Sequence, residues 1–152
     1  MRIPSSNSDL NRDASPLRFQ VSSLPIFNYD MPFLEAVKAS LRCPIERVTA
    51  VEDASDFEVG KIENGVMILL ADWSAPACLA LAGYSERLNV LNPNIPVWIV
   101  NVDSFEPVGA ILSHGWGEVY FFRKGRLIDQ LLRSKEDMAA RFAEKFEAFF
   151  PK

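Results

Sequence analysis

Residues 65–78 read GVMILLADWSAPAC, and they carry the strongest structural signal in the sequence. Its apolar residues, 66–71, lack the alternation of a half-exposed strand, which indicates a strand buried on both faces of a sheet. Asp72 and Trp73 follow, and a short turn containing Pro76 leads into a segment of helical periodicity. The stretch therefore predicts a central strand that delivers a tryptophan to the start of a helix.

The next segment continues this pattern. Residues 75–91 carry apolar side chains at helical spacing on one stripe, namely Ala77, Leu81, Tyr84, Leu88 and Leu91. A second largely apolar run, residues 95–102, reads as another central strand. A strand, a helix and a strand in this order predict two parallel strands joined by a right-handed crossover.

A hairpin and a helix are predicted to end the chain. Residues 119–122 and 127–132 flank a turn in which Gly125 supplies a positive φ angle, as antiparallel hairpins require. Residues 134–137 resemble a capping box. The helix after it is predicted to bury one stripe, consisting of Met138, Phe142, Phe146 and Phe149.

Three further elements are predicted. A helix at 30–42, with Asp30 as its N-cap, places Phe33, Leu34, Val37 and Leu41 on one side. A short strand is predicted at 48–51. Two short helices are expected, one at 57–62 before the central strand and one around 107–112 after the second strand.

Length and composition indicate one α/β domain. The chain has 152 residues, of which 49% are hydrophobic and 24% charged, as in an ordinary globular protein. Residues 1–26 are rich in serine and predict a flexible tail, and residues 27–152 predict a single domain. We expect a central mixed sheet of four or five strands flanked by helices.

Charge and cysteine content argue against several classes of partner and cofactor. A net charge of −4 and a pI near 5.0 give no support for nucleic acid or an anionic membrane as partner. No stretch is long and apolar enough to span a bilayer, and the N-terminus lacks a secretory signal pattern. Two unpatterned cysteines and one histidine indicate a reducing compartment, no metal site and no cofactor. The expected location is cytoplasmic; export through a specialised secretion system, addressed by the tail, is the alternative.

The order of these elements resembles the thioredoxin-like superfamily. Three segments support the resemblance: DFEVGKIENGVMILLADW (56–73), IPVWIVNVD (95–103) and VYFFRKGRLIDQLL (119–132). They are similar to the family's central strand with its active-site tryptophan, the following strand, and the final hairpin. The resemblance covers about residues 45–150, so the helix at 30–42 is an addition to the family's minimal fold.

The departures from the family are as informative as the matches. The resemblance places the two redox cysteines at Ser74 and Ala77, the glycine between them at Ala75, and the buried acid at Ile68. The loop that holds the family's cis-proline falls near Gly117, and the proline is absent. Thiol–disulfide exchange needs a thiolate and a resolving thiol, so dithiol oxidoreductase activity is not expected.

The resemblance also implies a binding surface. In redox-active members the active-site turn faces the cis-proline loop, and the two hold an extended peptide. The corresponding residues here are Trp73, Ser74, Ala75, Pro76, His114, Trp116 and Gly117. We therefore expect a non-redox protein that binds a protein or peptide, such as a chaperone, assembly factor or adaptor. Its partner and oligomeric state are left open.

Simpler roles for the same residues are also open. Ser74 fits the N-cap of the helix that follows it. Trp73 and Trp116 can serve packing, and His114 can be a solvated loop residue.

Two other functions are consistent with the sequence. Cys78 lies near a helix start, where thiol pKa values are lowered, so an enzyme that uses a single thiol is the second hypothesis. The polar tail and acidic body also allow a secreted effector or its immunity partner. An accessible Cys78 thiol with a low pKa would favour the single-thiol enzyme.

Overall fold

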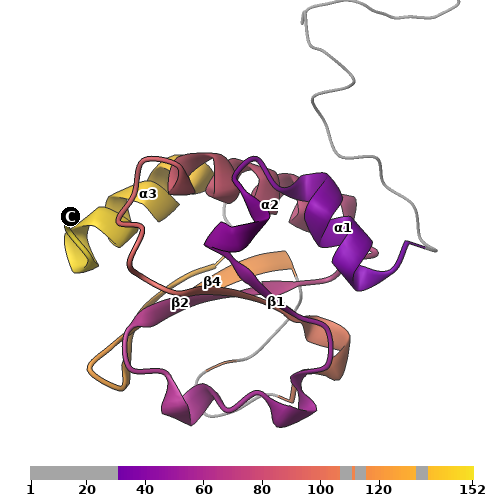
Figure 1. Cartoon of the computed structure of the whole chain (residues 1–152), viewed down its shortest axis with the longest axis horizontal. Coiled ribbons are helices and arrows are strands. Elements are labelled where there is room, and N and C mark those ends of the chain that lie inside the picture. Colours follow the sequence, from indigo (N-terminus) through magenta and orange to yellow (C-terminus); the bar gives the residue numbers. More distant parts are fainter. Residues whose placement is uncertain (1–30, 107–110, 112–115, 133–136) are drawn as a thin grey trace, which may run out of the picture.

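A five-stranded mixed sheet forms the centre of the protein in a computed structural model (Figure 1). The structure describes residues 31–106, 111, 116–132 and 137–152. The strands are β1 (Thr49–Val51), β2 (Gly65–Leu70), β3 (Val97–Asn101), β4 (Trp116–Arg123) and β5 (Arg126–Leu131). Their spatial order is β1-β3-β2-β4-β5. The predicted α/β class with a mixed sheet is confirmed, and the arrangement is compatible with a three-layer thioredoxin-like fold.

Strand β2 lies at the middle of the sheet, as its unbroken apolar sequence predicts. All six of its residues are buried. It pairs in parallel with β3, where Val66 lies opposite Val97, and antiparallel with β4, where Ile68 lies opposite Val119. The parallel pairing across the connecting helix confirms the predicted strand–helix–strand unit.

The hairpin of β4 and β5 also follows the prediction. Gly125 has a φ of +79° and Lys124 a φ of +55°, so both turn residues adopt the left-handed conformation. The amide of Gly125 donates to the carbonyl of Glu63 at 2.9 Å, and the amide of Lys124 donates to Oδ1 of Asn64 at 3.1 Å. These bonds fix the hairpin turn beside the segment that enters β2.

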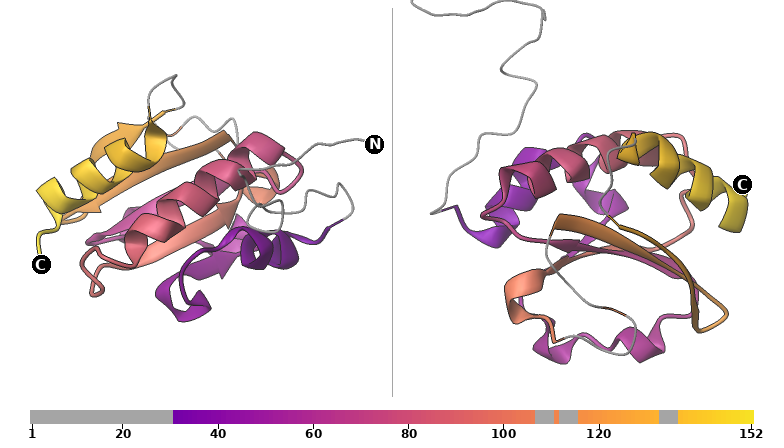
Figure 2. Two further views of the ribbon diagram at one scale, coloured as in Figure 1. Left: turned by 90° about the horizontal axis from the view of Figure 1, so that it is seen from above. Right: turned by 180° about the vertical axis from the view of Figure 1, so that it is seen from behind.

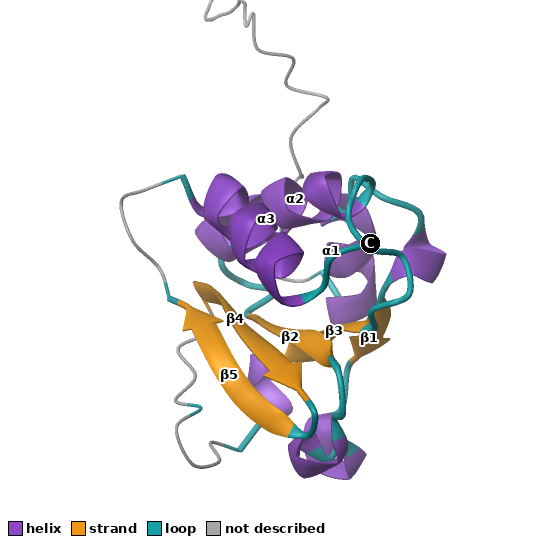
Figure 3. Cartoon of the chain, turned by 90° about the vertical axis from the view of Figure 1, so that its left-hand side faces the viewer, coloured by secondary structure: helices purple, strands orange, loops and turns teal. Residues whose placement is uncertain are grey.

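The α-helices lie side by side on one face of the sheet (Figure 2). They are α1 (Phe33–Ser40), α2 (Ala75–Leu88) and α3 (Met138–Phe149). Helix α2 lies between the other two and contacts both. The opposite face is covered by 3-10 helices, among them Ala54–Asp56 and Val59–Lys61 (Figure 3).

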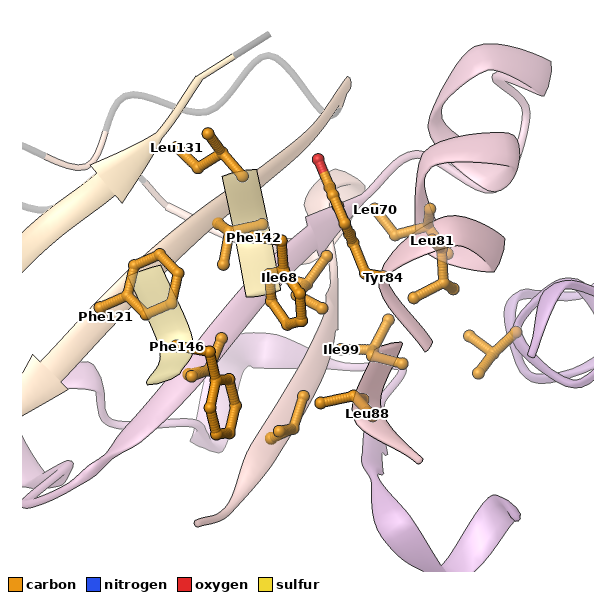
Figure 4. Close-up of a cluster of buried hydrophobic side chains, with 14 of the residues drawn as sticks. Ile68, Leu70, Leu81, Tyr84, Leu88, Ile99, Phe121, Leu131, Phe142 and Phe146 are labelled. Atoms are coloured by element: carbon orange, nitrogen blue, oxygen red, sulfur yellow. The ribbon is translucent and has the colours of Figure 1, made fainter. Parts of the chain in front are cut away.

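Two apolar clusters fill the space on either side of the sheet. The larger cluster lies under the α-helices, where Ile68 of β2 meets Tyr84 of α2 and Phe142 of α3 (Figure 4). The rings of Tyr84 and Phe142 stack with their centroids 4.9 Å apart. The smaller cluster contains Met67 and Tyr120 on the other face of the sheet. The predicted stripe of α2 is confirmed, because each of its members is buried.

Several predicted boundaries need correction. Helix α1 is shorter than the predicted 30–42, because Pro32 precedes its first residue and Leu41 is extended. Leu34 is 40% exposed instead of buried, since Phe33 and Val37 face the core. The short helix predicted at 57–62 is a 3-10 helix of three residues, Val59–Lys61. The extended residues Phe57 and Glu58 separate it from the 3-10 helix Ala54–Asp56. The tail, Asp30 and most of the helix predicted around 107–112 fall outside the described residues.

Helix α3 begins one residue after its cap. The Oδ1 atom of Asp137 accepts a hydrogen bond from the amide of Ala140 at 3.1 Å, so Asp137 is the N-cap. The rest of the predicted capping box lies outside the described residues. Lys145 fixes the helix to β5 through an ion pair of 2.6 Å with Asp129. Phe150, directly after the helix, is buried, whereas Phe149 is only partly covered.

Candidate functional site

The candidate site lies where β2 ends and α2 begins. Ser74 is the N-cap of α2: its hydroxyl accepts a hydrogen bond from the amide of Ala77 at 3.3 Å, as its sequence position predicts. Its amide donates to the carbonyl of Ala71 at 3.0 Å, which closes the turn. Pro76 stands in the first turn of the helix, where its missing N–H costs nothing. The turn is therefore fixed at both of its ends.

Replacing Ser74 with alanine is expected to lower the free energy of unfolding by about 1 kcal/mol. The substitution leaves the amide of Ala77 without its partner in a site where Ser74 is only 8% exposed. Urea denaturation measures the change. Ser74→Thr is the matched control, because it keeps a hydroxyl at the cap, and equal stability of Ser74→Ala and the wild type would contradict the capping role.

Three exposed apolar residues stand at this turn and in the first turns of α2. Trp73 is 43% exposed, and its Nε1 donates to Oδ1 of Asp103 at 3.3 Å, which holds the ring beside the 3-10 helix Val102–Ser104. Pro76 is exposed, and Leu79, one helical turn later, is 47% exposed. We call Trp73, Pro76 and Leu79 the Trp73 face.

Carboxylates lie beside the Trp73 face. Glu52 follows β1, Asp72 follows β2 and Asp103 follows β3, so the three residues come from the carboxyl ends of neighbouring parallel strands. Partial burial raises the pKa of Asp72, and the charges of Asp103 and Glu52 raise it further. We call Glu52, Asp72 and Asp103 the acidic rim.

Local hydrogen bonds fix the backbone that carries the acidic rim. The hydroxyl of Ser104 donates to the carbonyl of Glu52 at 3.1 Å and accepts from the amide of Ala54 at 2.9 Å. The side chain of Asn101 accepts from the amide of Asp103 at 3.1 Å. The segments that follow β1 and β3 are thus joined, which fixes the backbone at Glu52 and Asp103.

The turn carries no pair of thiols. Ser74 is engaged as the helix cap, Ala77 is fully buried, and Ala75 carries no reactive group. Ile68 lies fully buried among apolar side chains, so no acid stands below the turn at that position. Without a nucleophile and a resolving partner, these residues cannot exchange a disulfide.

Cys78 is placed in the core instead of on the surface. Its side chain is 5% exposed, and its Sγ lies 3.9 Å from the carbonyl oxygen of Asp72. Burial raises the pKa of the Cys78 thiol, and the nearby charge of Asp72 raises it too, although a hydrogen bond with Ser40 opposes them. A buried thiol with a raised pKa lacks the two properties that a reactive cysteine needs.

The second half of the predicted site is only partly described. Gly117 is buried at the start of β4, with a φ of +86°, and a β-carbon there would lie 3.2 Å from the β-carbon of Ala80. Its carbonyl accepts from the hydroxyl of Tyr84 at 3.2 Å. Gly117 therefore packs against α2 beside Ala80 and Tyr84. The backbone of Trp116 pairs with Leu70, and His114 lies outside the described residues.

Sequence reasoning did not identify Leu79 or the acidic rim as parts of this site. The signal for Leu79 was present, because it is a large apolar residue that lies off the buried stripe of α2. The rim residues each follow a predicted parallel strand, and the carboxyl ends of parallel strands meet at one edge. Around the turn, the sequence singles out Trp73, Ser74, Ala75 and Pro76, with Cys78 as a possible thiol.

No metal centre and no membrane span is found in the part of the chain that the structure describes. No group of three or more His, Cys, Asp or Glu residues among the described ones could hold a metal ion. None of the described helices is both long enough and apolar enough to cross a bilayer. No protein-family model matches the chain, and comparison with curated proteins finds no match.

Proposed function

We propose that this chain is a non-redox, thioredoxin-like protein that binds a protein or peptide partner through the Trp73 face. The observation that carries the proposal is the exposure of Trp73 and Leu79 around a turn whose own polar groups are already satisfied. Tryptophan is among the residues most enriched at the centres of protein interfaces. A rigid, apolar turn without a nucleophile suits binding and not turnover.

The competing single-thiol enzyme finds no support in the surroundings of Cys78. Its sulfur is buried, and burial raises its pKa, so the thiolate fraction near neutral pH is lower than that of a free cysteine. A chaperone, an assembly factor and an adaptor would all use the Trp73 face in the same way. The proposal therefore names the surface and the type of action, and the partner decides among these roles.

A peptide selection tests the proposal. Random peptides displayed on phage are selected on the immobilised full-length chain, and the affinity of the enriched peptides is measured by calorimetry. Trp73→Ala and Leu79→Ala are each expected to weaken binding about tenfold or more, because large side chains in a small interface carry most of its binding energy. The matched control is Val90→Ala, since Val90 is 63% exposed beyond the other end of α2.

The possible outcomes are distinct. Loss of affinity in Trp73→Ala and Leu79→Ala, with Val90→Ala unchanged, supports the Trp73 face. If no peptide is enriched, or if the enriched peptides bind Trp73→Ala as tightly as the wild type, the proposed function is wrong for this surface. Circular dichroism of each variant checks that the fold is intact.

A further inference from the structure

The Trp73 face combines apolar exposure with a fixed tryptophan ring. Because Nε1 of Trp73 is bonded to Asp103, the ring is held by its edge while 43% of the side chain is open to solvent. Leu79, one turn further along α2 than Pro76, exposes 47% of its side chain. Leu79 and Pro76 thus offer an apolar contact, and Trp73 offers an aromatic ring next to the carboxylate of Asp103.

Charge is distributed unevenly between the two ends of the sheet. The acidic rim lies where the parallel strands end. Basic side chains stand at the opposite end: the hairpin turn beside Asn64 carries Arg123, Lys124 and Arg126, and the Arg47 guanidinium donates to carbonyls just before β3. In Figure 1 the hairpin turn lies at the left of the sheet and the 3-10 helix Val102–Ser104 at its right. The Trp73 face therefore lies next to the acidic rim, at the other end of the sheet from the hairpin turn, where Glu63 is the acidic neighbour of the basic side chains.

We propose that the partner segment bound by the Trp73 face carries arginine or lysine next to a bulky apolar residue; this inference rests on the proposed function. The apolar residue packs against Leu79 and Pro76. The cation lies over the ring of Trp73 and within reach of the carboxylates of Asp72 and Asp103.

Three physical effects favour this occupant over an acidic or purely apolar one. A cation is attracted to the face of an indole ring, and most strongly to tryptophan among the aromatic residues. The carboxylates of the acidic rim repel one another, and this repulsion contributes to the raised pKa of Asp72. A bound cation reduces the repulsion, whereas a bound anion increases it. The negative charge of the acidic rim also attracts an approaching basic segment before contact.

A second copy of this chain is the competing occupant. The basic hairpin turn of one copy could meet the acidic rim of another in a head-to-tail contact, which does not close into a dimer. Two copies meeting through their Trp73 faces would instead bring two acidic rims together. A separate peptide avoids both consequences, so the charges favour a different chain as the partner.

Matched synthetic peptides test the inference. One peptide contains leucine flanked by arginines, and its control replaces each arginine with glutamate and keeps the leucine. Calorimetry with the full chain is expected to show binding of the arginine peptide and at least about tenfold weaker binding of the glutamate peptide. Raising the salt concentration well above about 0.1 M is expected to weaken the arginine peptide severalfold, because screening shortens the range of exposed charges.

Charge-removing variants locate the effect. Asp72→Asn combined with Asp103→Asn is expected to weaken binding of the arginine peptide about fivefold, because it removes the charge partners of the cation at half-buried Asp72 and exposed Asp103. Asparagine at 103 keeps an oxygen that can accept from Nε1 of Trp73. The control is Glu86→Gln combined with Glu147→Gln, which removes the same charge from exposed positions near the C-terminal ends of α2 and α3.

Each outcome decides between the claims. If Trp73→Ala abolishes peptide binding but the two asparagine substitutions and the glutamate peptide have no effect, the proposed binding function stands and the basic specificity is wrong. If the control pair of glutamine substitutions weakens binding equally, only net charge matters and the inference fails. If sedimentation shows assembly that grows with protein concentration and is abolished by the asparagine variant, the occupant is a second copy and the inference is overturned.

Discussion

Replacing Ile68 with aspartate is expected to lower the free energy of unfolding at pH 7 by about 4 kcal/mol or more. Ile68 is fully buried in β2, between Ile99 of β3 and Val119 of β4, and both neighbours are fully buried as well. The resemblance to thioredoxin-like proteins puts the family's buried acid at this position. In this chain an aspartate at position 68 would be buried among apolar side chains, with no solvent contact.

The loss of stability in Ile68→Asp is expected to depend on pH. Burial raises the folded-state pKa of the introduced carboxyl group above its unfolded value of about 3.9. The folded state then binds more protons than the unfolded state, so stability falls as pH rises through this interval and is greater at about pH 4 than at pH 7. Urea denaturation of Ile68→Asp and of Ile68→Asn at both pH values measures the effect.

The asparagine variant isolates the charge, because it has nearly the same shape and does not titrate. The difference between Ile68→Asp and Ile68→Asn is expected to grow with pH. A difference that is the same at both pH values, or a stable Ile68→Asp variant at pH 7, would mean that the site below the turn can hold a charge.

Replacing Phe142 with alanine is expected to lower the free energy of unfolding by about 3–5 kcal/mol. Phe142 is fully buried at the centre of the larger core cluster, where its ring stacks on Tyr84 at 4.9 Å and lies 5.8 Å from Phe146. Removing the ring leaves a cavity between α2, α3 and the sheet. Stabilities of small domains are about 5–15 kcal/mol, so the loss is a large share of the total.

Phe149→Ala is the matched control for this prediction. It makes the same chemical change at the end of the same helix, where the ring is only partly covered and lies 5.8 Å from the Arg123 guanidinium. Thermal and urea denaturation are expected to show less than half the loss found for Phe142→Ala. Equal losses would contradict the placement of the core under α2 and α3.

Most of the fold could be predicted because its signals are local. The unbroken apolar run of β2 could be satisfied only in the centre of a covered sheet, and the periodic stripe of α2 fixed which side of the helix is buried. The buried side of a helix was harder to predict where the spacing of apolar residues was consistent with two different faces. Leu34 fits the same helical spacing as Val37, yet the packing of α1 against α2 leaves Leu34 exposed.

The candidate site was less predictable than the fold for a physical reason. The turn from Trp73 to Pro76 is continuous in sequence, so its position before a helix could be inferred directly. The acidic rim is assembled from Glu52, Asp72 and Asp103, which are far apart in the chain and meet only because β1, β3 and β2 lie side by side. The partner of Nε1 of Trp73 likewise comes from a different strand end.

An NMR titration of the isotope-labelled full-length chain with an enriched peptide shows whether the peptide binds at the Trp73 face. Binding at the Trp73 face is expected to give the largest shift changes at the indole N–H of Trp73 and at the amides of Ala75, Leu79 and Asp103, with little change along α3 and β5. Shift changes centred on the β5 edge, on α3 or on the basic hairpin turn, with the Trp73 indole unmoved, would contradict it.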